Sequence, residues 1–186
     1  MVMQNRNFYK SMGKKFNKVW KSQNSLFGIW MGSNDVRLVD GDDQTKHNLY
    51  NKALDKMSSI LEDMYKNGAR NFLIINIPPL ETTPFSIKHN IDYVKKDADY
   101  FNSQLEYNMK LLSEKHEDIN IFIYDVNKRF LDIVNNCNEY QFEDCKNAWV
   151  KTKQYPINKY LYSDMTHYTY KAYETFVSDI VDMLNV

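Results

Sequence analysis

The chain contains little cysteine, glycine or proline, and it has no excess of charge of either sign. Its 186 residues include two cysteines, five glycines and four prolines, and its 24 basic side chains are balanced by 24 acidic ones. A formal charge of zero creates no net field that would attract a phosphate backbone or an anionic lipid surface. We therefore expect neither nucleic acid nor a membrane surface as a partner.

Long hydrophobic runs are also absent. The longest runs, such as residues 72–77, are far shorter than the roughly 20 apolar residues needed to cross a bilayer, so no membrane span is predicted. Residues 1–21 are charged and amphipathic, without the apolar core and cleavage site of a secretory signal peptide. Taken alone, these residues indicate either a cytosolic protein or a chain whose true start is missing.

The two cysteines, Cys137 and Cys145, lie eight residues apart in a polar stretch that resembles a surface loop. In an oxidising compartment they would close a short disulfide loop, whereas in the cytosol they would remain free thiols. The disulfide is favoured because a polar loop offers neither thiol a core to fill. No histidine or further cysteine stands at ligand spacing, so no metal site is predicted.

The apolar residues, 43% of the chain, are enough for one globular domain over residues 1–186. Their spacing alternates between the periods of helices and strands. Helices are expected over residues 1–23, 41–67, 86–116 and 127–134 and again through residues 172–184, with strands over 25–31, 71–77 and 119–126. This order predicts an α/β fold, an open parallel sheet with helices on both faces and an active site at the carboxyl ends of the strands.

One candidate site residue follows the first expected strand. That strand stops at Gly32 and presents Asn34 at its carboxyl end. A side-chain amide in this position can stabilise the oxyanion of an acyl-transfer intermediate, and removal of such a donor costs about a hundredfold or more in rate. The alternative is an ordinary Gly-Ser-Asn-Asp turn, which the segment favours when it is taken alone.

A second candidate site, Asp164 and His167, lies just before the last helix. A histidine acts as a general base when a carboxylate holds its other ring nitrogen and fixes the tautomer, and a separation of three residues allows that contact. The alternative makes Ser163 or Asp164 the N-cap of the helix, with His167 in its first turn. This alternative is also favoured when the segment is taken alone.

Together and in this order, the two segments resemble the Gly-Asp-Ser-Leu lipases and esterases, also called SGNH hydrolases. Residues 25–35 are similar to the family's third conserved block and residues 164–167 to its fifth, while residues 72–84 resemble the strand and proline-rich loop between them. The cysteine pair is similar to that of secreted fungal and bacterial members, including acetylesterases of carbohydrate esterase family 16. The resemblance covers nearly the whole chain.

The resemblance implies a three-layer, flavodoxin-like α/β fold and a serine ester hydrolase without a cofactor. Asn34 would be an oxyanion donor, His167 the base and Asp164 the acid that orients it. The substrate would be a small acyl ester or an acetylated carbohydrate, and the location extracellular. Three aromatic residues near the cysteines, Tyr140, Trp149 and Tyr155, are further candidates for substrate contact.

The nucleophile of the family is missing from the sequence. No Gly-Asp-Ser segment occurs. Ser33 is a poor substitute because no strand-to-helix elbow is expected to expose it, and Ser163 is a poor substitute because it precedes Asp164 on the same turn. The chain therefore resembles the carboxyl-terminal two-thirds of the family fold, truncated at its amino end with the first strands absent. Alone it is expected to be inactive. The alternative is a pseudoenzyme or remnant that binds carbohydrate or nothing.

The missing strands would also affect solubility. The strand over residues 25–31, interior in the family, would become an edge with unpaired backbone groups. We expect such a chain to be poorly soluble or to need a partner.

Overall fold

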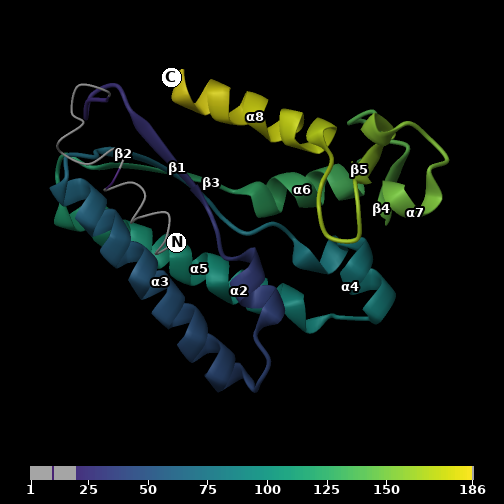
Figure 1. Ribbon diagram of the computed structural model, residues 1–186, viewed down its shortest axis with the longest axis horizontal. Coiled ribbons are helices and arrows are strands. Elements are labelled where there is room, and N and C mark those ends of the chain that lie inside the picture. The colour runs from purple at the N-terminus through teal and green to yellow at the C-terminus, as the bar shows by residue number, and fades with distance from the viewer. Residues whose placement is uncertain (1–9, 11–19, 186) are drawn as a thin grey trace. The chain divides into compact units, whose positions relative to one another are not determined.

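The computed structural model describes Lys10 and residues 20–185, in which helices and strands alternate along the chain (Figure 1). The helix expected over residues 1–23 lies almost entirely outside the described residues. The strands are β1 (Leu26–Trp30), β2 (Asn71–Ile75), β3 (Asn120–Tyr124), β4 (Asp144–Ala148) and β5 (Tyr160–Tyr162). The α-helices are α2 (Ser33–Leu38), α3 (Asp43–Lys66), α4 (Pro84–His89), α5 (Tyr93–Lys115), α6 (Val126–Asn135), α7 (Trp149–Thr152) and α8 (Tyr170–Leu184), and the 3₁₀ helices are η2 (Leu80–Thr82) and η3 (Ile157–Lys159).

The chain forms two compact units, each built from two segments. The first comprises the chain up to Ile77 together with Asp99–Tyr124, and the second comprises Pro78–Ala98 together with the chain from Asp125 onward. Helix α5 begins in the second unit and continues in the first.

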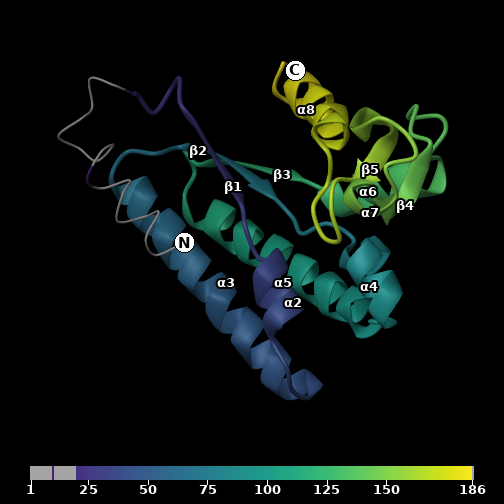
Figure 2. The ribbon, with the colours of Figure 1, turned by 45° about the vertical axis from the view of Figure 1, so that its right-hand side comes forward.

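The first unit contains three parallel strands in the order β1-β2-β3. The register aligns Phe27 with Phe72 and Phe72 with Ile121. Successive residues of β2 from Phe72 to Ile75 are all buried, which confirms the prediction of a strand buried on both faces. Figures 1 and 2 show α3 and the Asp99–Lys115 part of α5 running along one face of this sheet.

Helix α3 begins and ends where its sequence predicts. The side chain of Asp42 accepts a hydrogen bond from the backbone N–H of Thr45 at 2.8 Å and so caps the first turn. At the other end Asn67 is the C-cap, and Gly68 follows with a φ of 103°. This left-handed conformation costs glycine nothing, because glycine has no Cβ.

The prediction of one long helix over residues 86–116 is wrong, because the chain forms two helices there. Helix α4 ends at Asn90, which adopts the left-handed conformation with φ 50° and ψ 49°. The N–H of Ile91 then bonds to the carbonyl of Ser86 at 3.0 Å, a typical helix stop. Asparagine tolerates this backbone conformation better than most residues, so the apolar periodicity continues across a break in the backbone.

The second unit contains an additional small sheet in the stretch that was expected to be a surface loop. Strands β4 and β5 pair in parallel there, and Cys145 lies in β4 with only 5% of its surface exposed. A disulfide joins Cys145 to Cys137, with the Cα atoms 6.0 Å apart. The expectation of a polar loop is therefore wrong for Cys145, because pairing with β5 buries that part of the chain.

Candidate active site

The structure brings Asp164 and His167 into direct contact in the loop between β5 and α8. The imidazole Nδ1 of His167 lies 2.9 Å from Oδ2 and 3.0 Å from Oδ1 of the Asp164 carboxylate. The other ring nitrogen, Nε2, makes no hydrogen bond within the described part of the chain. A carboxylate at Nδ1 favours the tautomer in which Nε2 is free to accept a proton, which is the arrangement that a general base requires.

A tight turn positions the carboxylate. Oδ1 of Asp164 accepts hydrogen bonds from the backbone N–H groups of Thr166 and His167 at 2.8 and 2.9 Å. Partial burial raises the pKa of the Asp164 carboxyl, but these two bonds and the imidazole together outweigh it and hold the pKa below its ordinary value. Asp164 is thus kept ionised and able to orient the histidine.

The pair is not part of a helix N-terminus. The N-cap of α8 is Thr169, whose hydroxyl accepts from the N–H of Ala172 and donates to the carbonyl of Tyr160 at 2.8 Å. His167 therefore precedes the helix, and the alternative in which Ser163 or Asp164 caps it is wrong. That alternative missed the backbone bridge between Tyr162 and Tyr168, which closes the loop before the helix begins.

The proline-rich segment of the second unit supports the same loop at two points. The hydroxyls of Thr82 and Tyr162 lie 2.7 Å apart, and the backbone N–H of Phe85 donates to the carbonyl of Met165 at 2.8 Å. Phe85 is in the first turn of α4, where backbone N–H groups have no partner within the helix. The loop that carries Asp164 and His167 is therefore held by hydrogen bonds from η2 and α4.

Asn34 belongs to the first unit, in the first turn of helix α2. Its side-chain oxygen accepts a hydrogen bond from the Arg37 guanidinium at 3.0 Å. Its exposed amide nitrogen donates no hydrogen bond among the described residues, so that donor is available to a ligand. The contact with Arg37 orients the amide and leaves Nδ2 free.

The backbone before Asn34 depends on Gly32. Gly32 has a φ of 121°, and a Cβ there would lie 2.6 Å from the ring of Phe101 and 3.1 Å from Ile77. Asn102 secures the neighbouring strand end, because its side-chain amide bonds to both the N–H and the carbonyl of Ile77, at 2.9 and 3.0 Å. Phe101 and Asn102 of α5 thus lie against the segments that follow β1 and β2, beside Asn34.

Residues 4–180 match the sequence profile of the family described as GDSL-like lipase/acylhydrolase. The chain belongs to this family. The resemblance predicted from the residues is therefore confirmed. The parallel sheet and its helices fit the three-layer α/β fold of the GDSL, or SGNH, hydrolases, so the predicted fold class is confirmed as well.

Individual relatives are named as esterases or lipases. An acetylesterase of Thermothelomyces thermophilus is 30% identical over 135 residues, which cover 69% of this chain and 44% of the relative. A GDSL esterase/lipase of Arabidopsis thaliana is 29% identical over 102 residues, covering 51% of this chain and 29% of the relative. Another from Arabidopsis thaliana is 24% identical over 173 residues, covering 86% and 50%. The matched part of this chain thus spans half or less of the length of these relatives.

The environment of Ser33 differs from the expectation. A strand-to-helix turn does connect β1 with α2, and Ser33 is the first residue of that helix. The left-handed backbone of this turn falls on Gly32 and not on the serine. The elbow expected to be absent is therefore present, although its left-handed residue is Gly32 and not Ser33.

The three aromatic candidates differ in what they contact. Tyr140 donates to the Asp132 carboxylate and accepts from the Arg129 guanidinium at 2.8 Å, so its hydroxyl is engaged within the protein. The centroid of the Trp149 ring lies 5.4 Å from the Lys153 ammonium nitrogen. Tyr155 is 36% exposed. A role of these side chains in substrate contact stays a prediction.

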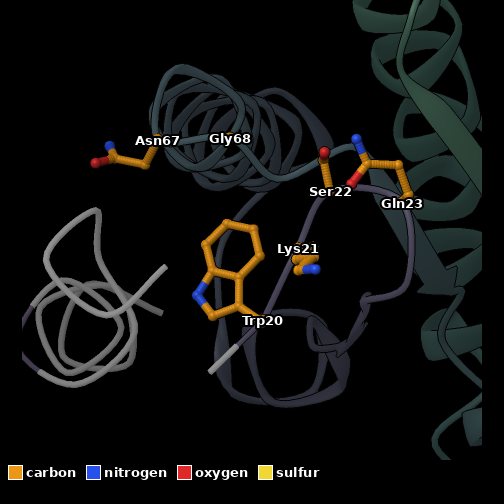
Figure 3. A pocket seen from close by; sticks show the side chains of 6 residues that line it. All are labelled: Trp20, Lys21, Ser22, Gln23, Asn67 and Gly68. Atoms are coloured by element: carbon orange, nitrogen blue, oxygen red, sulfur yellow. The ribbon is translucent and has the colours of Figure 1, made fainter. Parts of the chain in front are cut away.

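Two cavities in the described part of the first unit contain none of the candidate residues. One of about 240 Å³ is lined by Trp20, Lys21, Ser22, Gln23, Asn67 and Gly68, and Figure 3 shows the Trp20 indole beside the end of α3. Another of about 310 Å³ lies between side chains of α3 and α5. Across residues 20–185 and Lys10, no group of three or more His, Cys, Asp or Glu side chains is arranged to hold a metal ion. No helix in the same residues is long and apolar enough to cross a membrane.

Proposed function

We propose that this chain carries part of the machinery of a GDSL-type serine ester hydrolase. The observation that supports the proposal is the contact between His167 Nδ1 and the Asp164 carboxylate, which leaves Nε2 free. His167 would take the proton of an attacking serine hydroxyl, while Asp164 fixes the tautomer and stabilises the imidazolium that forms. The free amide of Asn34 would donate to the oxyanion of the tetrahedral intermediate.

The substrate we propose is a small acyl ester, such as an acetyl group on a carbohydrate. One relative is named an acetylesterase, and it is 30% identical over its matched region. An extracellular location is proposed on the same family relationship and on the Cys137–Cys145 disulfide, which is typical of oxidising compartments.

The attacking serine would come from a Gly-Asp-Ser strand that these 186 residues do not contain. We therefore expect the purified chain to hydrolyse p-nitrophenyl acetate no faster than a His167→Ala variant, measured by release of p-nitrophenol. A clear rate that depends on His167 would show that a nucleophile is present in this chain, and Ser33→Ala would then be the first variant to measure.

The alternative function is a catalytically inactive remnant that binds carbohydrate, which the exposed ring of Tyr155 favours. The genomic sequence upstream of Met1 distinguishes the hydrolase from the inactive remnant. An open reading frame upstream of Met1 that encodes a Gly-Asp-Ser strand supports the hydrolase. Stop codons or unrelated sequence there would overturn the hydrolase for this gene product and leave the remnant.

A further inference from the structure

The His167 side chain is largely exposed and the Asp164 side chain is half-buried, and so packing does little to orient the Asp164–His167 pair. The His167 side chain is 72% exposed and that of Asp164 is 44% exposed. Exposed side chains retain rotamer freedom unless hydrogen bonds restrict it. The geometry of the pair must therefore come from hydrogen bonds within its own loop.

Ser163 provides bonds of this kind at the base of the loop. Its backbone N–H donates to the carbonyl of His167 at 2.8 Å, and its Oγ lies 3.1 Å from the same carbonyl and 3.3 Å from that of Tyr168. Its own carbonyl accepts from the N–H of Val150 at 3.1 Å. Ser163 is thus bonded to the residue that carries the base and directly precedes the residue that carries the acid.

The hydroxyl of Ser163 is not arranged as a nucleophile. Its single proton is directed toward two backbone carbonyls of its own turn, whereas an attacking serine needs that proton to face the imidazole. Nothing within the described residues places this Oγ against the ring of His167. The hydroxyl therefore acts on the backbone of the loop.

We infer that Ser163 is a positioning residue, whose hydroxyl fixes the His167 backbone so that the imidazole Nδ1 meets the Asp164 carboxylate. The inference rests on the proposed function of that pair. Loss of the hydroxyl leaves the His167 carbonyl with one bond from the loop instead of two. The backbone at His167 then gains freedom, and the bonds that its N–H and Nδ1 make to Asp164 loosen together.

The test compares Ser163→Ala with the unaltered 186-residue chain by NMR. Loss of one hydrogen bond should speed hydrogen exchange of the His167 amide, the donor to Asp164 Oδ1, about fivefold. The carbon resonance of the Asp164 carboxyl should show its pKa moving upward, toward the ordinary value. Ser163→Thr keeps the hydroxyl and should restore both readouts.

Thr169→Ala is the matched control. It also removes a hydroxyl that bonds to a backbone carbonyl of this region, and it uncaps α8, but it leaves every bond between Ser163 and His167. It should lower the stability and leave both readouts unchanged. If Ser163→Ala does not fold, Ser163→Cys, which keeps the shape and weakens the donor, is measured instead.

Two outcomes would overturn the inference. One is an unchanged His167 exchange rate and Asp164 titration in Ser163→Ala, and the other is an equal change in Thr169→Ala, which would indicate a general loosening of the loop. Neither readout requires turnover, so failure here leaves the proposed hydrolase intact. Failure of the esterase assay or of the genomic test likewise leaves this measurement unaffected.

Discussion

Single residues couple the candidate site to pH and to the backbone beneath it. The clearest case is Asp164, whose ionised carboxylate accepts two backbone hydrogen bonds and one from the imidazole. Asn102 and Gly32 act in the same way on the backbone near Asn34, one through hydrogen bonds and the other through the absence of a side chain. Small substitutions at these positions should therefore have large effects on the stability of the protein or on its dependence on pH.

Asp164→Asn should make the chain less sensitive to acid. The pKa of Asp164 is lower in the folded protein than its ordinary value of about 3.9, so its stabilising effect is present above that value and is lost as the pH falls through the folded pKa. Asparagine keeps the oxygen that accepts from Thr166 and His167 but cannot titrate. Urea unfolding between about pH 6 and pH 2 should show a shallower loss of stability in the variant. Parallel curves would contradict the prediction.

Gly32→Ala should destabilise the protein by about 2–4 kcal/mol. The new methyl group would lie 2.6 Å from the Phe101 ring, and alanine would have to adopt a φ near 121°, so crowding and backbone strain add together. Urea denaturation measures the loss of stability.

Gly28→Ala is the matched control in the preceding strand. A Cβ at Gly28 has no heavy atom within 4 Å, and its φ is not in the left-handed range, so this variant should be neutral or slightly stabilising. Equal losses in the two glycine variants would show that the crowding at Gly32 relaxes.

At the scale of elements, the break between α4 and α5 depends on Asn90. This residue ends α4 with a left-handed backbone, and the chain then turns before α5 begins at Tyr93. The turn lies directly after the helix whose first N–H groups include the donor to Met165 in the candidate loop. The position of α4 therefore bears on the loop that holds Asp164 and His167.

Asn90→Ala should cost about 1 kcal/mol of stability, because alanine pays a steric penalty of roughly 1–2 kcal/mol in the left-handed conformation. Asn90→Gly removes that penalty and should match or exceed the unaltered protein. Thermal unfolding of the two variants checks the order. If alanine and glycine behave alike, the left-handed backbone at Asn90 does not limit the stability.

At the scale of the whole molecule, β1 is an edge strand of the sheet formed by the described residues. Strand β1 pairs with β2 alone among the described strands, and Leu26 in β1 is 41% exposed. Backbone N–H and C=O groups on such an edge pair readily with another chain. Poor solubility, or the need for a partner, is expected from the sequence for such an edge and stays a prediction.

Leu26→Lys should reduce self-association, because a charge on an edge strand opposes pairing with a second strand. Sedimentation velocity over a range of concentrations should show larger species for the unaltered chain than for the variant. Leu38→Lys is the matched control, since Leu38 is 69% exposed but lies in α2. A monomer at every concentration, or an equal effect of both lysines, would contradict the prediction.

Much of this protein follows from local patterns in its sequence. The continuous apolar run from Phe72 to Ile75 indicates a buried strand. Asp42 and Gly68 specify the ends of α3, because capping depends on residues close in the chain. The three-residue separation of Asp164 and His167 likewise permits their contact. Such features depend little on the rest of the molecule.

Tertiary structure decided what depends on residues far apart in the chain. Cys145 is buried because β4 pairs with β5, and the loop of His167 is anchored because Thr82 and Phe85 reach it from about 80 residues away. The sequence around Cys145 does not indicate the pairing of β4 with β5, and the sequence around His167 does not indicate the contacts of its loop with Thr82 and Phe85. The sequence alone determined that Asp164 and His167 are close enough to meet, whereas long-range hydrogen bonds decided how the loop that carries them is anchored, because such bonds form only when the chain is folded.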